Sequence, residues 1–307
     1  MRVIVVGLGI QGKKRLAVAG LDAIATVDPV LAADFKNVED VPLDRFDAAL
    51  VCTPDEPKLE LLRYLLKNGK HVLVEKPLFA DKAGLGELTE LSRKNHVTCY
   101  TAYNHRFEPH FINMKKIIES GELGKIHSLS MFYGNGTARD VRNSTWRDQG
   151  DGVLPDLGSH ILDTLDFLLG EPVKKRRFSP WSFDKFENRT YDHVIFASRG
   201  EPLIVCEATL LSWKNTFRLD VVGEKGSAHI DCLCKWGPST LTVRTRVLPS
   251  GRPAERVDTL VQADPTWVEE YKHFKGLCKE GLSNIKNDAW IMSQLQDIRS
   301  NIEEHDA

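Results

Sequence analysis

The 307-residue sequence lacks closely spaced sets of cysteines and has no large surplus of charge of either sign. It has six cysteines, and the one close pair, Cys232 and Cys234, is not followed by a second Cys/His pair at zinc-site spacing. We therefore expect neither disulfides nor a metal site. The 41 basic and 43 acidic residues give a formal net charge of −2, which provides no reason to expect nucleic acid or a membrane as a partner.

Long apolar runs are also missing. No stretch approaches the ~18 apolar residues of a membrane span. The first apolar run, Val3–Val6, ends at a glycine turn rather than continuing as a secretory signal. These absences lead us to expect a cytoplasmic protein. The length, with 42% hydrophobic and 27% charged residues, suffices for two domains with separate cores.

The N-terminus carries the strongest functional signal. Val3–Val6 runs directly into Gly7-Leu8-Gly9-Ile10-Gln11-Gly12 and then into a stretch expected to be helical. Gly7 permits a tight turn, Gly9 lets backbone N–H groups approach a pyrophosphate, and Gly12 lets the helix pack against the strand. The helix N-terminus, with Ile10 and Gln11, favours the phosphates. A glycine turn without a ligand is the alternative for this motif taken alone.

The next apolar run supports a dinucleotide and indicates which one. Ala23–Val27 ends in Asp28, about 20 residues after the first glycine, where a carboxylate can accept hydrogen bonds from the adenosine ribose. That carboxylate would repel a 2′-phosphate, and residues 29–33 contain no cation. We therefore predict NAD in preference to NADP. Lys13, Lys14 and Arg15 either place charge near the phosphates or are solvated.

The alternation of apolar segments predicts two domains. Through about residue 120, strands alternate with helices, which indicates a parallel sheet covered on both faces. The expected strands are 3–6, 24–27, 48–52, 72–74 and 97–101, and the expected helices include 58–68 and 82–94. We expect an α/β Rossmann dinucleotide-binding domain over residues 1–120.

From residue 121 onward, β-rich and alternating runs dominate, including 127–133, 193–198, 203–211, 216–222 and 240–247. Helices are expected near 157–169, 267–279 and 288–304, the second of these with Thr266 as N-cap. We expect an α+β domain over residues 121–307, built on an open, mostly antiparallel sheet, that binds substrate and mediates oligomerisation. Because 203–211 carries apolar residues on both faces, we expect a homodimer or homotetramer.

Two polar motifs follow neighbouring strands of the first domain. Thr53-Pro54 ends the third strand and Glu75-Lys76-Pro77 ends the fourth, at the strand ends where open α/β sheets bind ligands. Lys76 could hydrogen-bond a substrate hydroxyl or transfer a proton. The alternatives are an ordinary Thr-Pro turn and a solvated lysine. A sharp turn with a cis Lys76–Pro77 bond would direct the lysine into the crevice.

A third motif lies in the second domain. Asp156 and His160 are four residues apart and would share one helix face, where the carboxylate can fix the histidine tautomer for acid–base chemistry. The alternative is a structural histidine below a first-turn carboxylate that the helix dipole favours.

Together these motifs resemble the Gfo/Idh/MocA family of NAD(P)-dependent oxidoreductases over nearly the whole chain. The resemblance implies that Lys76 polarises the reacting oxygen, that His160 exchanges its proton, and that Asp156 holds His160 or the substrate. It implies hydride transfer between nicotinamide and a sugar carbon, with Thr53, Pro54, Glu75 and Lys76 near the cofactor. Many members carry a histidine just after Thr-Pro, and this chain departs from them there, with Asp55-Glu56-Pro57-Lys58.

The candidate substrate contacts are Asn104, Arg106, Trp146 and Arg147. The run 137–147 contains three arginines and Trp146, which suit a sugar with a negative group such as a nucleotide-linked sugar. The alternative is a solvated loop whose arginines pair with neighbouring aspartates. Two other functions stay open, an NAD-retaining glycosidase on the same fold and a non-catalytic NAD-bound regulator.

Overall fold

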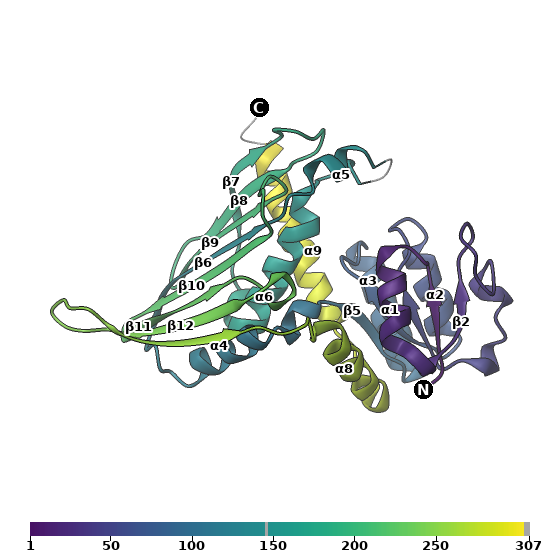
Figure 1. Cartoon of the computed structure of the whole chain (residues 1–307). Coiled ribbons are helices and arrows are strands. Elements are labelled where there is room, and N and C mark those ends of the chain that lie inside the picture. Colours follow the sequence, from purple (N-terminus) through teal and green to yellow (C-terminus); the bar gives the residue numbers. More distant parts are fainter. Residues whose placement is uncertain (145–146, 304–307) are drawn as a thin grey trace. The chain divides into compact units, whose positions relative to one another are not determined.

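The computed structural model describes residues 1–144 and 147–303, and it divides into two compact units (Figure 1). One unit is Met1–Asn104 with Pro265–Met292, and the other is His105–Asp264 with the residues from Ser293 onward. This division differs from the single boundary expected after residue 120, because the chain returns to the first unit. The returning elements are α8 (Thr266–Glu280) and the first turns of α9 (Ile285–Glu303).

The first unit contains the predicted parallel sheet. Its five strands lie in the order β2-β1-β3-β4-β5, and every pair is parallel. The strands are β1 (Val3–Val6), β2 (Ala23–Val27), β3 (Ala48–Val51), β4 (His71–Glu75) and β5 (Cys99–Ala102). The helices between them are α1 (Ile10–Ala19), α2 (Lys58–Lys67) and α3 (Lys82–Asn95), and short 3₁₀ turns span Gly20–Asp22, Val38–Asp40 and Leu43–Arg45.

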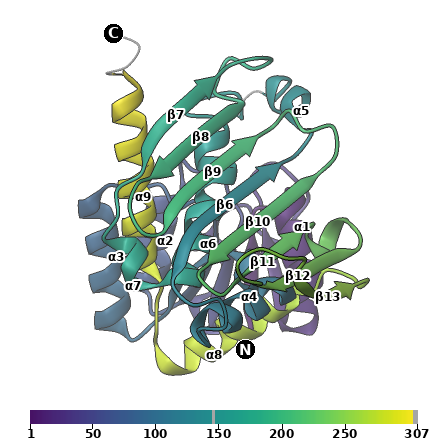
Figure 2. The same ribbon diagram turned by 90° about the vertical axis from the view of Figure 1, so that its left-hand side faces the viewer.

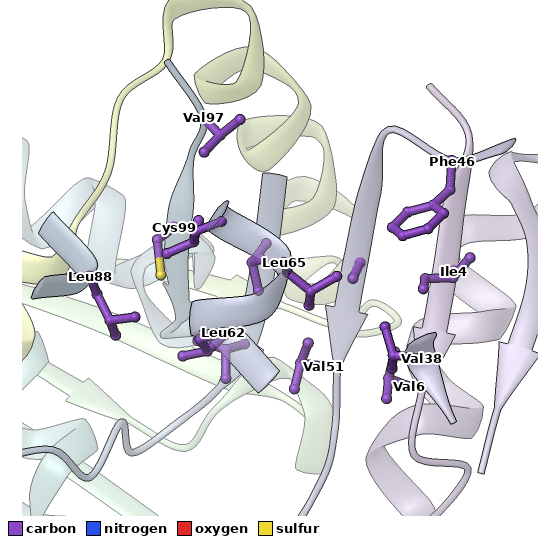
Figure 3. Close-up of a cluster of buried hydrophobic side chains, with 14 of the residues drawn as sticks. Ile4, Val6, Val38, Phe46, Val51, Leu62, Leu65, Leu88, Val97 and Cys99 are labelled. Carbon is purple, nitrogen blue, oxygen red and sulfur yellow. The ribbon is translucent and has the colours of Figure 1, made fainter. Parts of the chain in front are cut away.

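Both faces of this sheet are buried, which explains its continuous apolar strands. On one face Ile4, Val6 and Val51 belong to one buried cluster with leucines of α2 and α3 (Figure 3). On the other face Val3 and Val5 belong to a second cluster that includes residues of α1 and of the returning α8. The return of α8 therefore completes the covering of the first sheet.

The second unit is built on an eight-stranded sheet in the order β13-β12-β11-β10-β6-β9-β8-β7. Its one parallel pair is β6 with β9, so the expected mostly antiparallel sheet is confirmed. The strands are β6 (Ile126–Gly134), β7 (Ser179–Asp184), β8 (His193–Ser198), β9 (Leu203–Thr209), β10 (Thr216–Gly223), β11 (Gly226–Asp231), β12 (Ser239–Thr245) and β13 (Ala254–Leu260). The sequence analysis did not identify β7, β11 or β13.

Helices cover one face of the second sheet and leave the other open (Figures 1 and 2). The helices of this unit are α4 (Pro109–Glu119), α5 (Ala138–Arg142), α6 (Ser159–Leu169), α7 (Glu171–Lys174) and the later turns of α9. Ile204 and Cys206 of β9 are fully buried on the helix side, whereas Leu203 is 44% exposed. No helix in the described part of the chain is both long enough and apolar enough to cross a membrane.

Two helix starts differ from the expectation in detail. The helix expected near 157–169 is α6, and a π-helical turn, Leu154–Gly158, precedes it and contains Asp156, which therefore lies outside the α-helix. Thr266 is the first residue of α8 rather than its N-cap, which is Pro265. The Thr266 hydroxyl instead accepts a hydrogen bond from Asn104 Nδ2 at 2.8 Å.

Candidate active site

The glycine loop after β1 requires glycine for packing at two positions and leaves open space at the third. Gly7 has φ +87°, and a Cβ there would lie 2.7 Å from the Cys52 carbonyl oxygen. A Cβ at Gly12 would lie 1.8 Å from the Gly7 carbonyl oxygen. A Cβ at Gly9 would meet no atom within 4 Å. The loop therefore packs closely against the end of the sheet at Gly7 and Gly12, and leaves space next to Gly9, as binding of a pyrophosphate requires.

The loop lies at the point where the strand order reverses, between β1 and β3, which is where open α/β sheets bind ligands. Thr53 follows β3, and its buried Oγ1 has no hydrogen-bond partner among the described residues. On the first turn of α1, Ile10 is 78% exposed. A dinucleotide fits these features, because its hydroxyl groups would satisfy Thr53 and its apolar surfaces would cover Ile10.

Asp28 is bound more firmly than the sequence indicates. Its Oδ2 accepts the Leu8 N–H at 2.7 Å, and its Oδ1 accepts the N–H groups of Val30 and Leu31 at 2.9 and 2.7 Å. Burial alone would raise its pKa, but the three backbone donors outweigh burial and hold the pKa below its usual range. Asp28 therefore stays ionised and ties the glycine loop to the end of β2.

Arg15 is neither solvated nor close to open space, because it lies in a buried ion cluster. The guanidinium is 1% exposed, and it pairs with Glu75 and with Glu270 of α8, both at 2.7 Å. It also lies 4.3 Å from the Trp267 ring centroid. Burial raises the pKa of Glu270 to about 7 despite the arginine. Glu75, predicted to contact cofactor, thus joins β4 to α1.

A second buried cation, Lys58, holds the backbone around Lys76. Lys58 is 3% exposed, and its Nζ donates to the carbonyl oxygens of Glu75 and Pro77, both at 3.2 Å. It also pairs with Asp55 at 2.6 Å. The Lys76–Pro77 bond is cis, as predicted. Lys58 belongs to the Asp55–Lys58 segment, where this chain departs from the family pattern. This segment therefore holds the backbone on both sides of Lys76.

In the second unit, His160 lies in an aromatic cluster at the start of α6. It is 7% exposed and stacks on His105, with ring centroids 4.1 Å apart and planes inclined by 19°. Tyr133 of β6 lies 5.4 Å from His105 and 6.1 Å from His160, centroid to centroid. Asp156 lies in the π-helical turn just before this helix, and such turns often occur at functional sites.

Three of the predicted substrate contacts, Asn104, Arg106 and Arg147, have partners within the protein. Arg106 donates from Nε and Nη2 to Asp163 and from Nη2 to Asp166 at 2.7 Å, so its guanidinium is used in packing against α6. The structure therefore gives no support to a substrate contact of Arg106. The Asn104 amide nitrogen likewise donates to the Thr266 hydroxyl. Arg147 Nη2 lies 3.6 Å from an Asp156 carboxylate oxygen. Trp146 lies outside the described residues.

The sequence analysis missed Lys235, which lies in the 3₁₀ turn Cys234–Trp236. Its Nζ lies 3.4 Å from His105 Nε2 and 3.5 Å from the Tyr133 hydroxyl. The ammonium lies 4.7 Å from the Trp236 ring centroid. Lys235 is thus next to the histidine that stacks on His160. No local motif marks it, because strands far apart in sequence bring these residues together.

The comparisons agree with this division into a nucleotide-binding unit and a β-rich unit. Residues 22–103 match the model described as "Oxidoreductase family, NAD-binding Rossmann fold". Residues 111–229 match the GFO/IDH/MocA C-terminal domain. The chain belongs to the GFO/IDH/MocA family. The resemblance drawn from the motifs is therefore confirmed, and the NAD-binding Rossmann fold of this family corresponds to the first unit.

Curated relatives of this family member include two inositol dehydrogenases. An inositol 2-dehydrogenase of Rhizobium meliloti is 24% identical over 59% of this chain and 56% of its own length. A myo-inositol 2-dehydrogenase of Thermotoga maritima is 31% identical over 42% of this chain and 38% of its own length. The chain thus matches only about half the length of such relatives.

Solved structures share the fold along the whole chain. A levoglucosan dehydrogenase in complex with NADH and levoglucosan has a TM-score of 0.84 at 18% identity, covering 99% of this chain and 97% of its own. An inositol dehydrogenase homolog from Azotobacter vinelandii, complexed with NADH and myo-inositol, has a TM-score of 0.78 at 18% identity over 99% and 96% of the two chains.

The clamp around Lys76 leads to a first prediction. Lys58→Met should lower kcat more than it changes substrate KM or NAD affinity, because the two carbonyls that flank Lys76 lose their common donor. It should also lower the free energy of unfolding by roughly 1–3 kcal/mol, since buried acceptors are left unsatisfied. Steady-state kinetics and urea unfolding measure both effects. Lys67→Met, on the exposed end of the same helix, is the control, and an unchanged kcat in Lys58→Met would refute the positioning role.

The fixed charge of Asp28 leads to a second prediction. The native protein should bind NAD more tightly than NADP, and Asp28→Ser should narrow the ratio of the two dissociation constants, because the carboxylate that repels a 2′-phosphate is gone. Fluorescence titration measures the ratio. Asp34→Ser, which removes an exposed carboxylate that bonds Thr26, is the control. A native preference for NADP would show that Asp28 does not select the cofactor.

Proposed function

We propose that this chain is an NAD-dependent oxidoreductase that transfers a hydride between nicotinamide and a hydroxyl-bearing carbon of a sugar or inositol. The observation that carries the proposal is the position of Lys76. It follows β4 on the same sheet edge as the glycine loop after β1 and Thr53 after β3. Oxidation of an alcohol to a carbonyl releases a hydride and a proton, and a hydrogen-bond donor beside a dinucleotide seat can stabilise the negative charge that develops on the reacting oxygen.

The roles follow from the chemistry of each side chain. Gly7, Gly9, Gly12 and the N-terminus of α1 would hold the pyrophosphate, and Thr53 would bond a hydroxyl of the cofactor. Bound NAD supplies the hydride acceptor or donor. The Lys76 ammonium donates a hydrogen bond to the reacting oxygen, and His160 takes its proton as the alcohol is oxidised. Asp156 orients His160 or the substrate.

The substrate class rests on the similar proteins, which are dehydrogenases of inositol and of levoglucosan. A nucleotide-linked sugar, as the arginine-rich run predicts, receives less support. Arg142 donates to the Glu187 carbonyl, and Arg147 lies beside Asp156, so two of the three arginines already have protein partners. We therefore propose a small sugar or polyol.

The catalytic assignment is tested by two substitutions. Lys76→Met and His160→Ala should each lower kcat by roughly 10²- to 10⁴-fold, which is the usual contribution of a positioned acid–base group, and leave the NAD dissociation constant nearly unchanged. Rates of NADH formation with a panel of inositols and sugars measure this. His110→Ala, a buried histidine that bonds the Ser239 carbonyl, is the control. Near-native turnover in Lys76→Met would exclude that lysine from the chemistry.

We further propose that a second copy of the chain covers the open face of the eight-stranded sheet. Trp181 of β7 is 74% exposed and Leu203 of β9 is 44% exposed on the edge half of this sheet. A homodimer or homotetramer buries such side chains by symmetry. Light scattering at micromolar concentration should give the mass of an oligomer, and Leu203→Lys should weaken it. A monomeric native protein would contradict this proposal.

A further inference from the structure

We propose that Lys235 binds an anionic group of the substrate, so that the preferred sugar carries a carboxylate or a phosphate. This inference rests on the proposed function, because it names the substrate class of that same site. It differs from the arginine-based prediction in the residue that supplies the charge.

Lys235 lies beside the predicted catalytic histidine. Its Nζ is 3.4 Å from His105 Nε2, and the His105 ring is stacked on that of His160 at 4.1 Å. Since an ammonium only donates, His105 Nε2 accepts this hydrogen bond. The rings of His105, His160 and Tyr133 are buried, whereas Lys235 is exposed. Only the His105 ring separates His160 from the Lys235 ammonium, so a ligand bound at His160 would lie close to a positive charge.

The turn that carries Lys235 is held from below. Glu108, which is 2% exposed, accepts the Cys234 N–H at 2.9 Å and the Cys234 thiol at 3.1 Å. Burial raises the pKa of this carboxyl, and its two acceptor bonds are used within the protein. Glu108 thus fixes the backbone one residue before Lys235 without forming an ion pair with it. A fixed turn with an exposed cation is preorganised for binding.

The charge of Lys235 is not neutralised by a direct partner. Within the described ranges, its polar contacts are His105 and Tyr133, both longer than 3.3 Å, and it forms no ion pair. Loss of hydration lowers the pKa of Lys235, and Asp264, Glu108 and Asp156 oppose this only from longer range. An anionic ligand would favour the charged form of the lysine and gain a charge-assisted hydrogen bond. The adjacent Trp236 ring offers an apolar surface for a sugar.

The test compares three probes on the NAD-loaded protein: glucuronate, glucose 6-phosphate and neutral glucose. Native protein should show a KM at least about tenfold lower for one of the anionic probes than for glucose. Lys235→Met should raise that KM by about 10- to 100-fold and raise the KM for glucose much less, with NAD affinity unchanged. Lys235→Arg should restore most of the affinity. Lys214→Met, an exposed lysine of the same unit, should behave like the native protein.

Binding is measured separately by calorimetry on the NADH complex, so that the two proposals fail in different ways. Lys235-dependent binding of an anionic probe, with no turnover of that probe or of any member of the inositol and sugar panel, would support the inference and contradict the proposed function. Turnover of glucose with no preference for either anionic probe would overturn the inference and leave the proposed function standing. An equal loss of kcat on all three probes in Lys235→Met would also overturn it, because that pattern indicates a structural role. If no probe binds, the inference fails, and the proposed function fails as well only if the panel of inositols and sugars also gives no NADH.

Discussion

The buried ion cluster around Arg15 is the constraint on which the first unit depends. The arginine is on the helix that follows the glycine loop, Glu75 ends β4, and Glu270 lies on α8, more than 190 residues further along the chain. A charge taken out of water this completely is tolerated only if it is paired, and loss of one member typically costs roughly 3–5 kcal/mol. The cluster therefore ties the returning α8 to the nucleotide-binding sheet.

The same cluster supports the segment of Lys76, for which we propose a catalytic role, because Glu75 directly precedes Lys76. Arg15 holds the Glu75 side chain from one side, and Lys58 holds the carbonyls of Glu75 and Pro77 from the other. The backbone that carries Lys76 is thus held on both sides. Catalytic groups need such support, because small displacements from the reacting geometry cost large factors in rate. The network of buried charges thus positions the backbone of Lys76 and also stabilises the fold of the first unit.

The sequence predicted what depends on local pattern and missed what depends on distant partners. The five parallel strands and the glycine loop were predictable, because a doubly covered strand is continuously apolar and a pyrophosphate turn needs glycine at fixed spacing. The burial of Arg15 could not be predicted, because its two carboxylate partners come from β4 and α8, which are far away in the sequence. Lys58, His105 and Lys235 were missed for the same reason. Asp156 was placed on an α-helix because i and i+4 spacing cannot reveal a π-helical turn.

The central claim is that a hydride moves between a sugar-type substrate and nicotinamide on this chain. Incubation with NAD and substrates deuterated at each ring carbon, followed by mass spectrometry of cofactor and product, tests it directly. The account predicts that deuterium from one ring carbon appears in released NADH, with an oxidised product. Deuterium that returns to the same sugar, with cleavage of a glycosidic bond, would indicate an NAD-retaining glycosidase. The absence of transfer from any inositol or sugar tested, with NAD bound, would contradict an enzymatic role.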